Sequence, residues 1–554
     1  MARLVLDSLL RLAPCALLLV ASTASFSQST RLSTAEVAAW REDVRTLGSE
    51  LPRRHKNAFA RLSRTTWDSA VRRLDERVPQ LRRHEVMVEI MRLVALVRDG
   101  HTGLNPDFED RLGFHRLPLR LYDFADGLFI VSADSAHRDL AGARVVRIGR
   151  ATATAALDSA SRLVSHEGAN WVRFRAPSLL TISEVLAALH LSDDPMRASF
   201  TVEQNGRERT VVLEASRPAA GAGHGPAPND FVDMRSVTPG DDPLWLQQPS
   251  RVYWFRVLPD RTLYINHRAV QFIDAGVTNE AFFRRAFAAG DSAGVERVVL
   301  DIRVNGGGNN FLNRFLVKEI IRRPNLDRPD RFLVLIGRGV FSAAQNLVNE
   351  LDFYTNGTFV GEPTGNAPNQ YGDARALELP NSKIRVFVSS LLWQSHSAMD
   401  ERTWFTPDVF VEATSADYHA KRDPVLETAL RRVTEASLGQ RLAQDAERGD
   451  TVAVRRTIET YRANPENRFR DVEADVNAAG YELLNARRME SAIAVMRINV
   501  ALFPRSANAY DSLGEAYERA DQKEAAIAAY RKALELDARM FSARDGLRRL
   551  GASP

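Results

Sequence analysis

The residues of this chain with the clearest chemical potential are a serine and a histidine, each beside a glycine-containing turn. Ser342 lies between the apolar run at 332–336 and a helix-like segment that follows it. A serine at such a junction either caps the helix or acts as a nucleophile. The start of a helix offers unpaired N–H groups and the positive end of the helix dipole, which stabilise a developing oxyanion. The position therefore suits attack on a carbonyl, provided that a base removes the hydroxyl proton.

Three consecutive glycines could complete an anion-binding turn. They follow the apolar stretch of "VVLDIRVNGGGNN", at 306–308, and precede another helix-like segment. Glycines at this place let backbone N–H groups converge on an anion or a polarised carbonyl, although a tight strand-to-helix turn needs them equally. No Gly-Lys-Ser/Thr follows, and the dinucleotide-binding pattern is absent, so the stretch does not indicate a nucleotide site.

His101 is the candidate base. It lies in "VALVRDGHTGL", where a helical pattern ends in a turn. An imidazole with a pKa near 6.5 suits general-base catalysis at neutral pH. A single histidine in such a turn is more often a cap or a surface residue, so the residue type alone does not assign its role.

The composition indicates a soluble, multidomain protein. The chain has 554 residues, more than one hydrophobic core usually serves. Its 74 basic and 70 acidic residues nearly balance, and no dense basic stripe alternates with aromatic residues. We therefore expect no nucleic-acid partner.

Residues 1–27 predict a secretory signal peptide. Basic residues flank an apolar stretch at 12–21, and small residues follow it. This stretch is too short to span a bilayer comfortably, although an uncleaved anchor is the alternative. Pro14 precedes Cys15, the only cysteine, which argues against lipidation. Cleavage would leave a chain without thiols, so we expect a periplasmic or secreted protein with no disulfide, no thiolate metal site and no integral span beyond the signal segment.

The rest of the chain divides by pattern into five parts. We expect a helical domain at 34–105, a β-rich domain at 114–216, a flexible linker at 217–229, an α/β domain of alternating strands and helices at 230–432, and a wholly helical region at 433–554.

The helical tail contains a repeat with the 34-residue period of tetratricopeptide (TPR) motifs. Gly480 and Gly514 fall in register, as do Ala492 and Ala526, at positions where two antiparallel helices need small residues. Residues 436–465 predict a weaker third helical pair. Such an array either docks a peptide or protein partner or simply caps the enzyme domain.

The order of several motifs resembles the S41 serine peptidases, which include the C-terminal processing proteases and the tricorn core proteases. The motifs are "LVRDGHTGL", "RVVLDIRVNGGGN", "GVFSAAQNLVNEL", "FVGEPTGN", "FTPDVFVEAT" and "RDPVLETAL". The resemblance covers 35–432 and is strongest from 296 to 432. It implies an α/β core of the ClpP/crotonase type, a nucleophile at Ser342, oxyanion donors at Ala343 and at Gly307 or Gly308, a peptide or protein substrate, and no metal or organic cofactor.

The resemblance also bears on the base. Processing proteases use a lysine soon after the "GEPTG" segment, but Asn366 or its neighbours stand there and no lysine lies between Lys318 and Lys383. The tricorn-like members use the histidine that matches His101. They orient it with a carboxylate upstream of a Pro-Asp pair, which implies Asp400 or, preferably, Glu401.

Two features depart from the family pattern. Phe341 and Gln345 stand where many members carry a small residue and a glutamate. Residues 118–215 resemble a diverged PDZ domain, but the segment at 165–189 does not fit that pattern and looks inserted.

Three functions are therefore open. The first is an exported serine peptidase that cleaves peptide bonds through an acyl-enzyme on Ser342, with His101 as the general base. The second is a catalytically inactive peptidase fold that assembles partners through its TPR region. The third is acyl-CoA chemistry on the crotonase-like core, against which export argues.

Overall fold

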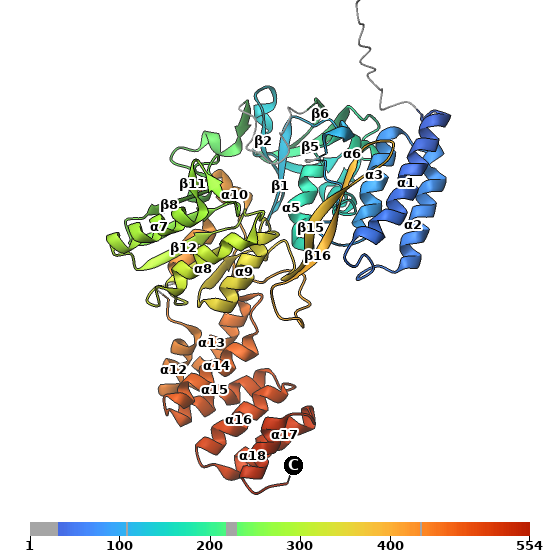
Figure 1. Cartoon of the computed structure of the whole chain (residues 1–554). Coiled ribbons are helices and arrows are strands. Elements are labelled where there is room, and N and C mark those ends of the chain that lie inside the picture. Colours follow the sequence, from blue (N-terminus) through green and yellow to red (C-terminus); the bar gives the residue numbers. More distant parts are fainter. Residues whose placement is uncertain (1–30, 107–108, 218–229, 433–434, 554) are drawn as a thin grey trace, which may run out of the picture.

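The computed structural model describes residues 31–106, 109–217, 230–432 and 435–553 (Figure 1). The predicted signal peptide lies outside the described residues, as does all of the predicted linker except Arg217. In the part that is described, no helix is both long enough and apolar enough to cross a membrane.

Three helices open the described chain, as the periodicity predicts. They are α1 (Thr34–Arg54), α2 (Arg64–Arg77) and α3 (Arg83–Ala95). A capping box formed by Ser33 and Glu36 begins α1. Most residues of α3 are buried, and the helix ends just before the turn that carries His101.

An antiparallel sheet follows in the order β1-β2-β3-β5-β6. The hairpin between β5 and β6 turns at Asn205 and Gly206, both with positive φ, which is typical of an Asn-Gly turn. Three helices lie between β4 and β5 along the chain. The elements of this part are β1 (Leu119–Phe124), β2 (Gly127–Asp134), β3 (Arg144–Ile148), β4 (Ala151–Thr152), α4 (Ala153–Ser161), α5 (Ala169–Leu179), α6 (Ser183–Ala188), β5 (Arg197–Gln204), β6 (Arg207–Glu214) and β7 (Phe231–Asp233).

A second sheet runs in the order β17-β14-β13-β12-β9-β8, and all its neighbours are parallel except β8 and β9. Its strands are β8 (Tyr253–Val257), β9 (Thr262–His267), β12 (Arg297–Asp301), β13 (Phe332–Ile336), β14 (Thr358–Gly361) and β17 (Val409–Phe410). This is the predicted alternation of parallel strands and helices.

Helices cover both faces of this parallel sheet. On one face lie α7 (Asn279–Ala293), α8 (Asn313–Ile321) and α9 (Ala343–Tyr354), and on the other lies α11 (Pro424–Arg432). Burial on both faces explains why β12 and β13 read as continuous apolar runs rather than as alternating ones. The loops that leave the carboxyl ends of these two strands carry the three glycines and Ser342.

A long hairpin connects the part that contains the N-terminal helices and the first sheet with the part that contains the parallel sheet (Figure 1). Its strands are β15 (Asn369–Glu378) and β16 (Arg385–Gln394). Apolar residues of its far end share one core with the N-terminal helices and the first sheet. The buried carboxylate of Asp43 on α1 accepts the backbone N–H groups of Asn381 and Ser382 at the hairpin's turn, at 2.8 and 2.9 Å. The hairpin therefore holds the N-terminal helices against the α/β part of the molecule that contains the parallel sheet.

The tail is helical throughout its described residues and stacks as antiparallel pairs (Figure 1). Its helices are α12 (Leu438–Glu447), α13 (Thr451–Ala463), α14 (Val472–Asn485), α15 (Met489–Leu502), α16 (Ala507–Arg519), α17 (Lys523–Leu536) and α18 (Phe541–Arg549). A Cβ on Gly480 would lie 2.7 Å from Met496 Cε, and one on Gly514 would lie 2.6 Å from Tyr530 Cδ1. The close approach predicted at these two glycines is confirmed.

Replacing Gly514 by alanine should destabilise the tail. Tyr530 is 2% exposed, and its ring is held between Gly514 and Gly546, so it has no room to retreat. Alanine gains about 1 kcal/mol in helix propensity, but overpacking a fixed neighbour typically costs about 1–3 kcal/mol. We expect a net loss in the free energy of unfolding, measured by denaturant titration of the full chain. Lys523→Ala, at an exposed position of the next helix, is the control, and an unchanged midpoint for Gly514→Ala would contradict the packing.

Candidate active site

Ser342 stands at the sharp turn between β13 and α9. Its backbone has φ 57° and ψ −126°, and its side chain makes no capping hydrogen bond with the helix. A positive φ in a residue other than glycine costs roughly 1–3 kcal/mol and is typical of functional sites. Buried amides hold the turn, since Asn366 Oδ1 accepts the Ser342 N–H at 2.8 Å and Gln370 Nε2 donates to the Ser342 carbonyl at 3.0 Å. The alternative of a simple helix cap is therefore wrong.

The glycine loop lies directly against Ser342. A Cβ on Gly307, which has φ 98°, would lie 2.6 Å from Ser342 Cβ and 2.8 Å from the Ala343 nitrogen. The Gly307 N–H, however, donates to Asn305 Oδ1 at 2.9 Å. Because this N–H group is already bonded, Gly307 does not fit the predicted role of oxyanion donor. The absence of a side chain at Gly307 instead lets the glycine loop approach Ser342 closely.

The backbone leaves two other N–H groups available. Gly308 is exposed, and neither its N–H nor that of Ala343 has a hydrogen-bond acceptor among the described residues. Ala343 is the first residue of α9, where N–H groups have no partner within the helix. A side chain on Gly308 would collide with the carbonyl oxygen of Val270, so that position is restricted to glycine. Of the predicted donors, Gly308 and Ala343 are the ones that fit.

His101 lies beside the residue that precedes the serine. Its ring stacks on Phe341 with centroids 4.4 Å apart. Part of the residue is exposed, but both ring nitrogens are buried, and neither has a hydrogen-bond partner in the described part of the chain. Burial lowers the pKa of His101 below its usual 6.5, and the charges of Asp99 and Asp373 oppose that shift only in part. The imidazole is therefore neutral at pH 7 and has a free nitrogen for a proton.

A buried carboxylate fixes the turn that carries His101. Asp99 Oδ1 accepts the His101 N–H at 3.0 Å, and Asp99 Oδ2 accepts the Thr102 hydroxyl at 2.6 Å. His55 Nε2 lies 2.9 Å from Asp99 Oδ2, and its Nδ1 accepts the N–H of Asn57. Burial alone would raise the pKa of Asp99, but these donors and the nearby His101 bring it to about 2. The turn is thus held by a permanent charge.

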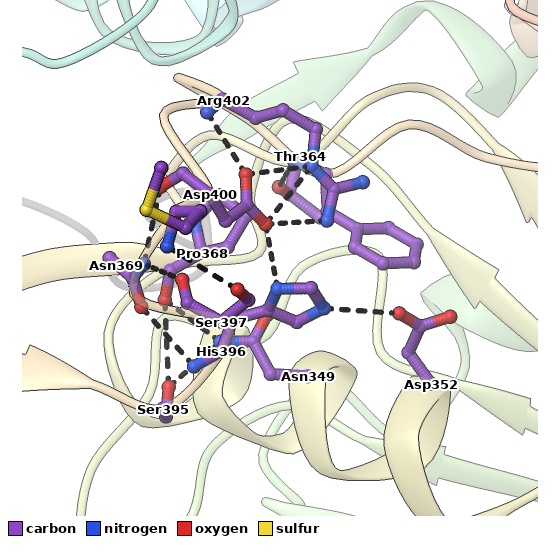
Figure 2. A network of polar contacts seen from close by, with 12 residues as sticks. Asn349, Asp352, Thr364, Pro368, Asn369, Ser395, His396, Ser397, Asp400 and Arg402 are labelled. Atoms are coloured by element: carbon purple, nitrogen blue, oxygen red, sulfur yellow. Dashed lines mark hydrogen bonds and ion pairs between the residues drawn. The ribbon is translucent and has the colours of Figure 1, made fainter. Parts of the chain in front are cut away.

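The structure places the two predicted orienting carboxylates elsewhere. Asp400 forms ion pairs with His396 Nδ1 at 2.8 Å and with Arg402 Nη2 at 2.7 Å (Figure 2). Burial raises the pKa of Asp400, but Arg402 outweighs it and the net shift is downward. Glu401 is exposed. Neither carboxylate is hydrogen-bonded to His101, whose ring nitrogens have no partner among the described residues. The charge of Asp400 is compensated by Arg402 on the same loop.

Three further residues lie against Ser342 or its neighbours, and the sequence alone assigned no role to them. Asn366 bonds the Ser342 backbone, Glu167 Oε2 accepts Asn366 Nδ2 at 3.0 Å, and Trp171 stacks on Phe341 at 4.0 Å. Weak signals existed, since Asn366 stands where processing proteases carry lysine, and the other two lie in the segment that looks inserted. Neither signal by itself assigns a role.

The comparisons with known proteins bear on the fold. No protein-family model matches the chain, and no curated protein matches it in sequence. Among solved structures, a serine-to-alanine mutant of CPAF matches with a TM-score of 0.52 and 12% identity, covering 73% of this chain and 99% of that one. Mature CPAF matches with a TM-score of 0.51 and 14% identity, covering 72% and 97%. The D1 C-terminal processing protease of photosystem II also matches, with a TM-score of 0.31 and 16% identity over 69% of this chain and 94% of that one.

The two CPAF matches identify the fold as that of the S41 serine peptidases. CPAF is a peptidase of that family, and the mixed α/β architecture is shared over nearly its whole length. The resemblance seen in the motifs is thereby confirmed for the fold. The chain is similar to CPAF and extends beyond the shared fold.

Proposed function

We propose that this protein is an exported serine peptidase that hydrolyses peptide bonds through an acyl-enzyme on Ser342, with His101 as the general base. The observation that carries the proposal is the Ser342 turn itself. Its backbone is strained, its hydroxyl makes no capping bond, and the N–H groups of Gly308 and Ala343 have no acceptor among the described residues. A buried, neutral imidazole packs against the preceding residue. These are the parts that acyl transfer requires.

The proposed reaction has two stages. His101 takes the hydroxyl proton while Ser342 Oγ bonds to the substrate carbonyl carbon, and the N–H groups of Gly308 and Ala343 stabilise the oxyanion. The C–N bond then breaks, and His101 gives its proton to the leaving amine. Water repeats the attack on the ester with His101 again as the base, which releases the acid and restores Ser342.

Substrate binding must bring His101 and Ser342 into hydrogen-bond contact. Catalytic hydrogen bonds are often long or misaligned before substrate binds and tighten afterwards. In the substrate complex, Glu401 remains the proposed carboxylate that orients His101, because Glu401 is exposed and the adjacent Asp400 is held by Arg402. A shift of the loop at 395–404 would be needed to bring Glu401 to the imidazole.

We also propose that the first sheet is a diverged PDZ-like domain and that the tail is a TPR array. The antiparallel pairs α14–α15 and α16–α17, with glycines at their closest approach, support the second assignment. Arg470 of the tail pairs with Asp408 of the α/β region at 2.9 Å. The tail would recruit a protein partner or substrate close to the peptidase, and the predicted signal peptide would place both in the periplasm or outside the cell.

Covalent labelling tests the proposed function. A fluorophosphonate probe should label the purified full-length protein with one phosphonyl group, and peptide mapping should place that group on Ser342. The same protein should cleave unfolded casein. Labelling at another serine would remove Ser342 from the mechanism, and neither labelling nor cleavage would favour the inactive scaffold.

A further inference from the structure

The segment at 165–175 contacts the elements that carry both proposed catalytic residues. Ser165 Oγ donates to the Asp99 carbonyl at 2.7 Å, in the turn of His101. The ring of Trp171 stacks on Phe341, beside Ser342. Gly168 packs on the loop before β17, since a Cβ there would lie 2.7 Å from the Thr403 carbonyl oxygen. Although it lies far from Ser342 in sequence, the segment belongs structurally to the site.

Glu167 is at the centre of these contacts and is 2% exposed. On one side, its Oε2 accepts Asn366 Nδ2 at 3.0 Å, and the same amide accepts the Ser342 N–H through Oδ1 at 2.8 Å. On the other side, a Cβ on Gly100 would lie 2.9 Å from Oε2, so the carboxyl lies against the residue next to His101. Its second oxygen, Oε1, has no hydrogen-bond partner in the described structure.

The surroundings disfavour a charge on Glu167. Burial raises its pKa to about 8, and the anionic Asp99 adds to the shift, while the Gly100 amide and Arg61 oppose it. His166 on the same segment is neutral at pH 7, since burial and the charges of Arg98 and Arg61 lower its pKa to about 4. The other titratable neighbours are His101, already neutral, and His55, which bonds Asp99. An ionised Glu167 would therefore face a second carboxylate with little compensation.

We propose that Glu167 is a positioning residue that holds the Ser342 turn and the His101 turn in register through its contacts with Asn366 and Gly100. The inference rests on the proposed peptidase function. Through Asn366, Glu167 fixes the strained backbone of Ser342, and through its contact with Gly100 it limits how far the His101 turn can move. Ionisation in alkaline solution would set Glu167 against Asp99 and loosen both turns.

The chain should thus contain a built-in alkaline limit. Wild-type kcat should fall as the pH rises through about 8, while KM changes little, because positioning rather than binding is lost. Glu167→Gln keeps the size and an acceptor oxygen for Asn366 but cannot ionise. It should lower kcat about threefold at pH 7 and show no decline near pH 8. Glu167→Ala removes the acceptor and should lower kcat about 10- to 100-fold relative to the wild type at pH 7.

A second measurement does not depend on activity. The pKa of Glu167 is 4.5 in the unfolded chain, whereas burial raises this pKa to about 8 in the folded chain. The folded state therefore binds more protons between these values, and stability falls as the pH rises across that window. The Tm of the wild type should drop relative to that of Glu167→Gln from pH 4.5 to 8. Glu208→Gln, an exposed carboxylate on β6, should follow the wild type.

The outcomes separate the two proposals. Parallel Tm curves for wild type and Glu167→Gln would overturn the inference, as would an alkaline fall in kcat that persists in Glu167→Gln. If the wild type neither labels nor cleaves while the Tm curves diverge, the peptidase proposal and the positioning role both fail, and only the buried neutral carboxyl survives. If the wild type is active and Glu167→Ala is as active as Glu167→Gln, the positioning role alone is wrong.

Discussion

Ser342→Ala is expected to abolish both peptide cleavage and fluorophosphonate labelling. Loss of the nucleophile removes the acyl-enzyme route, and comparable losses are on the order of 10⁴-fold or more in kcat. The fold should not change, since alanine and serine tolerate φ 57° about equally and the serine side chain makes no bond to the helix that would be lost. Cleavage of a fluorogenic peptide and the Tm measured in parallel check both expectations.

A matched control separates the nucleophile from general effects of removing a hydroxyl. Ser292 is an exposed serine near the end of α7, and in the described part of the chain its hydroxyl bonds only the Ala288 carbonyl of the same helix. Ser292→Ala should label and cleave like the wild type. Residual cleavage by Ser342→Ala above a few per cent of wild type, with an unchanged Tm, would show that another group carries the reaction.

The local parts of this site could be predicted from the sequence. Ser342, the glycines and His101 each follow a helix or an apolar strand. A turn at the end of such an element has only a few possible roles, such as a cap, a tight connection or an anion-binding site. The fold class follows equally directly, because strands buried on both faces and alternating with helices indicate a parallel sheet. The helix pairs of the tail follow from a fixed period and from the small residues at their crossings.

The connections between distant segments could not be predicted in this way. Whether the Gly307 N–H faces a substrate or Asn305 depends on the side-chain rotamer of Asn305 and not on residue type. Asp400 stood at the expected distance from a Pro-Asp pair, but Arg402, two residues later, neutralises it. The link from Glu167 to Asn366 joins residues 199 positions apart, and no local pattern encodes it. Likewise, one core unites the helices at 34–95 with the first sheet, where the pattern suggested two domains.

His101→Gln should lower kcat/KM by roughly 10²- to 10⁴-fold, the usual contribution of a positioned general base. Glutamine preserves much of the volume against Phe341 but cannot accept a proton at neutral pH. His419→Gln, at an exposed histidine on α10 (Ser415–His419), should be as active as the wild type. Equal loss in both variants would point to a general effect of histidine replacement instead of a base at His101.

The pH profile supplies the more discriminating evidence. Because burial lowers the pKa of His101, the acid limb of wild-type kcat/KM should lie below pH 6.5, and residual His101→Gln activity should lack that limb. Stability should also decrease at acid pH. Below pH 6.5 His101 binds a proton more readily in the unfolded chain than in the folded chain, so the free energy of unfolding of the wild type falls as the pH falls. His101→Gln should lose this part of the acid sensitivity. An acid limb at or above pH 6.5 would mean that the imidazole becomes solvated or paired with a carboxylate in the working enzyme, and it would make the approach of Glu401 the first rearrangement to look for.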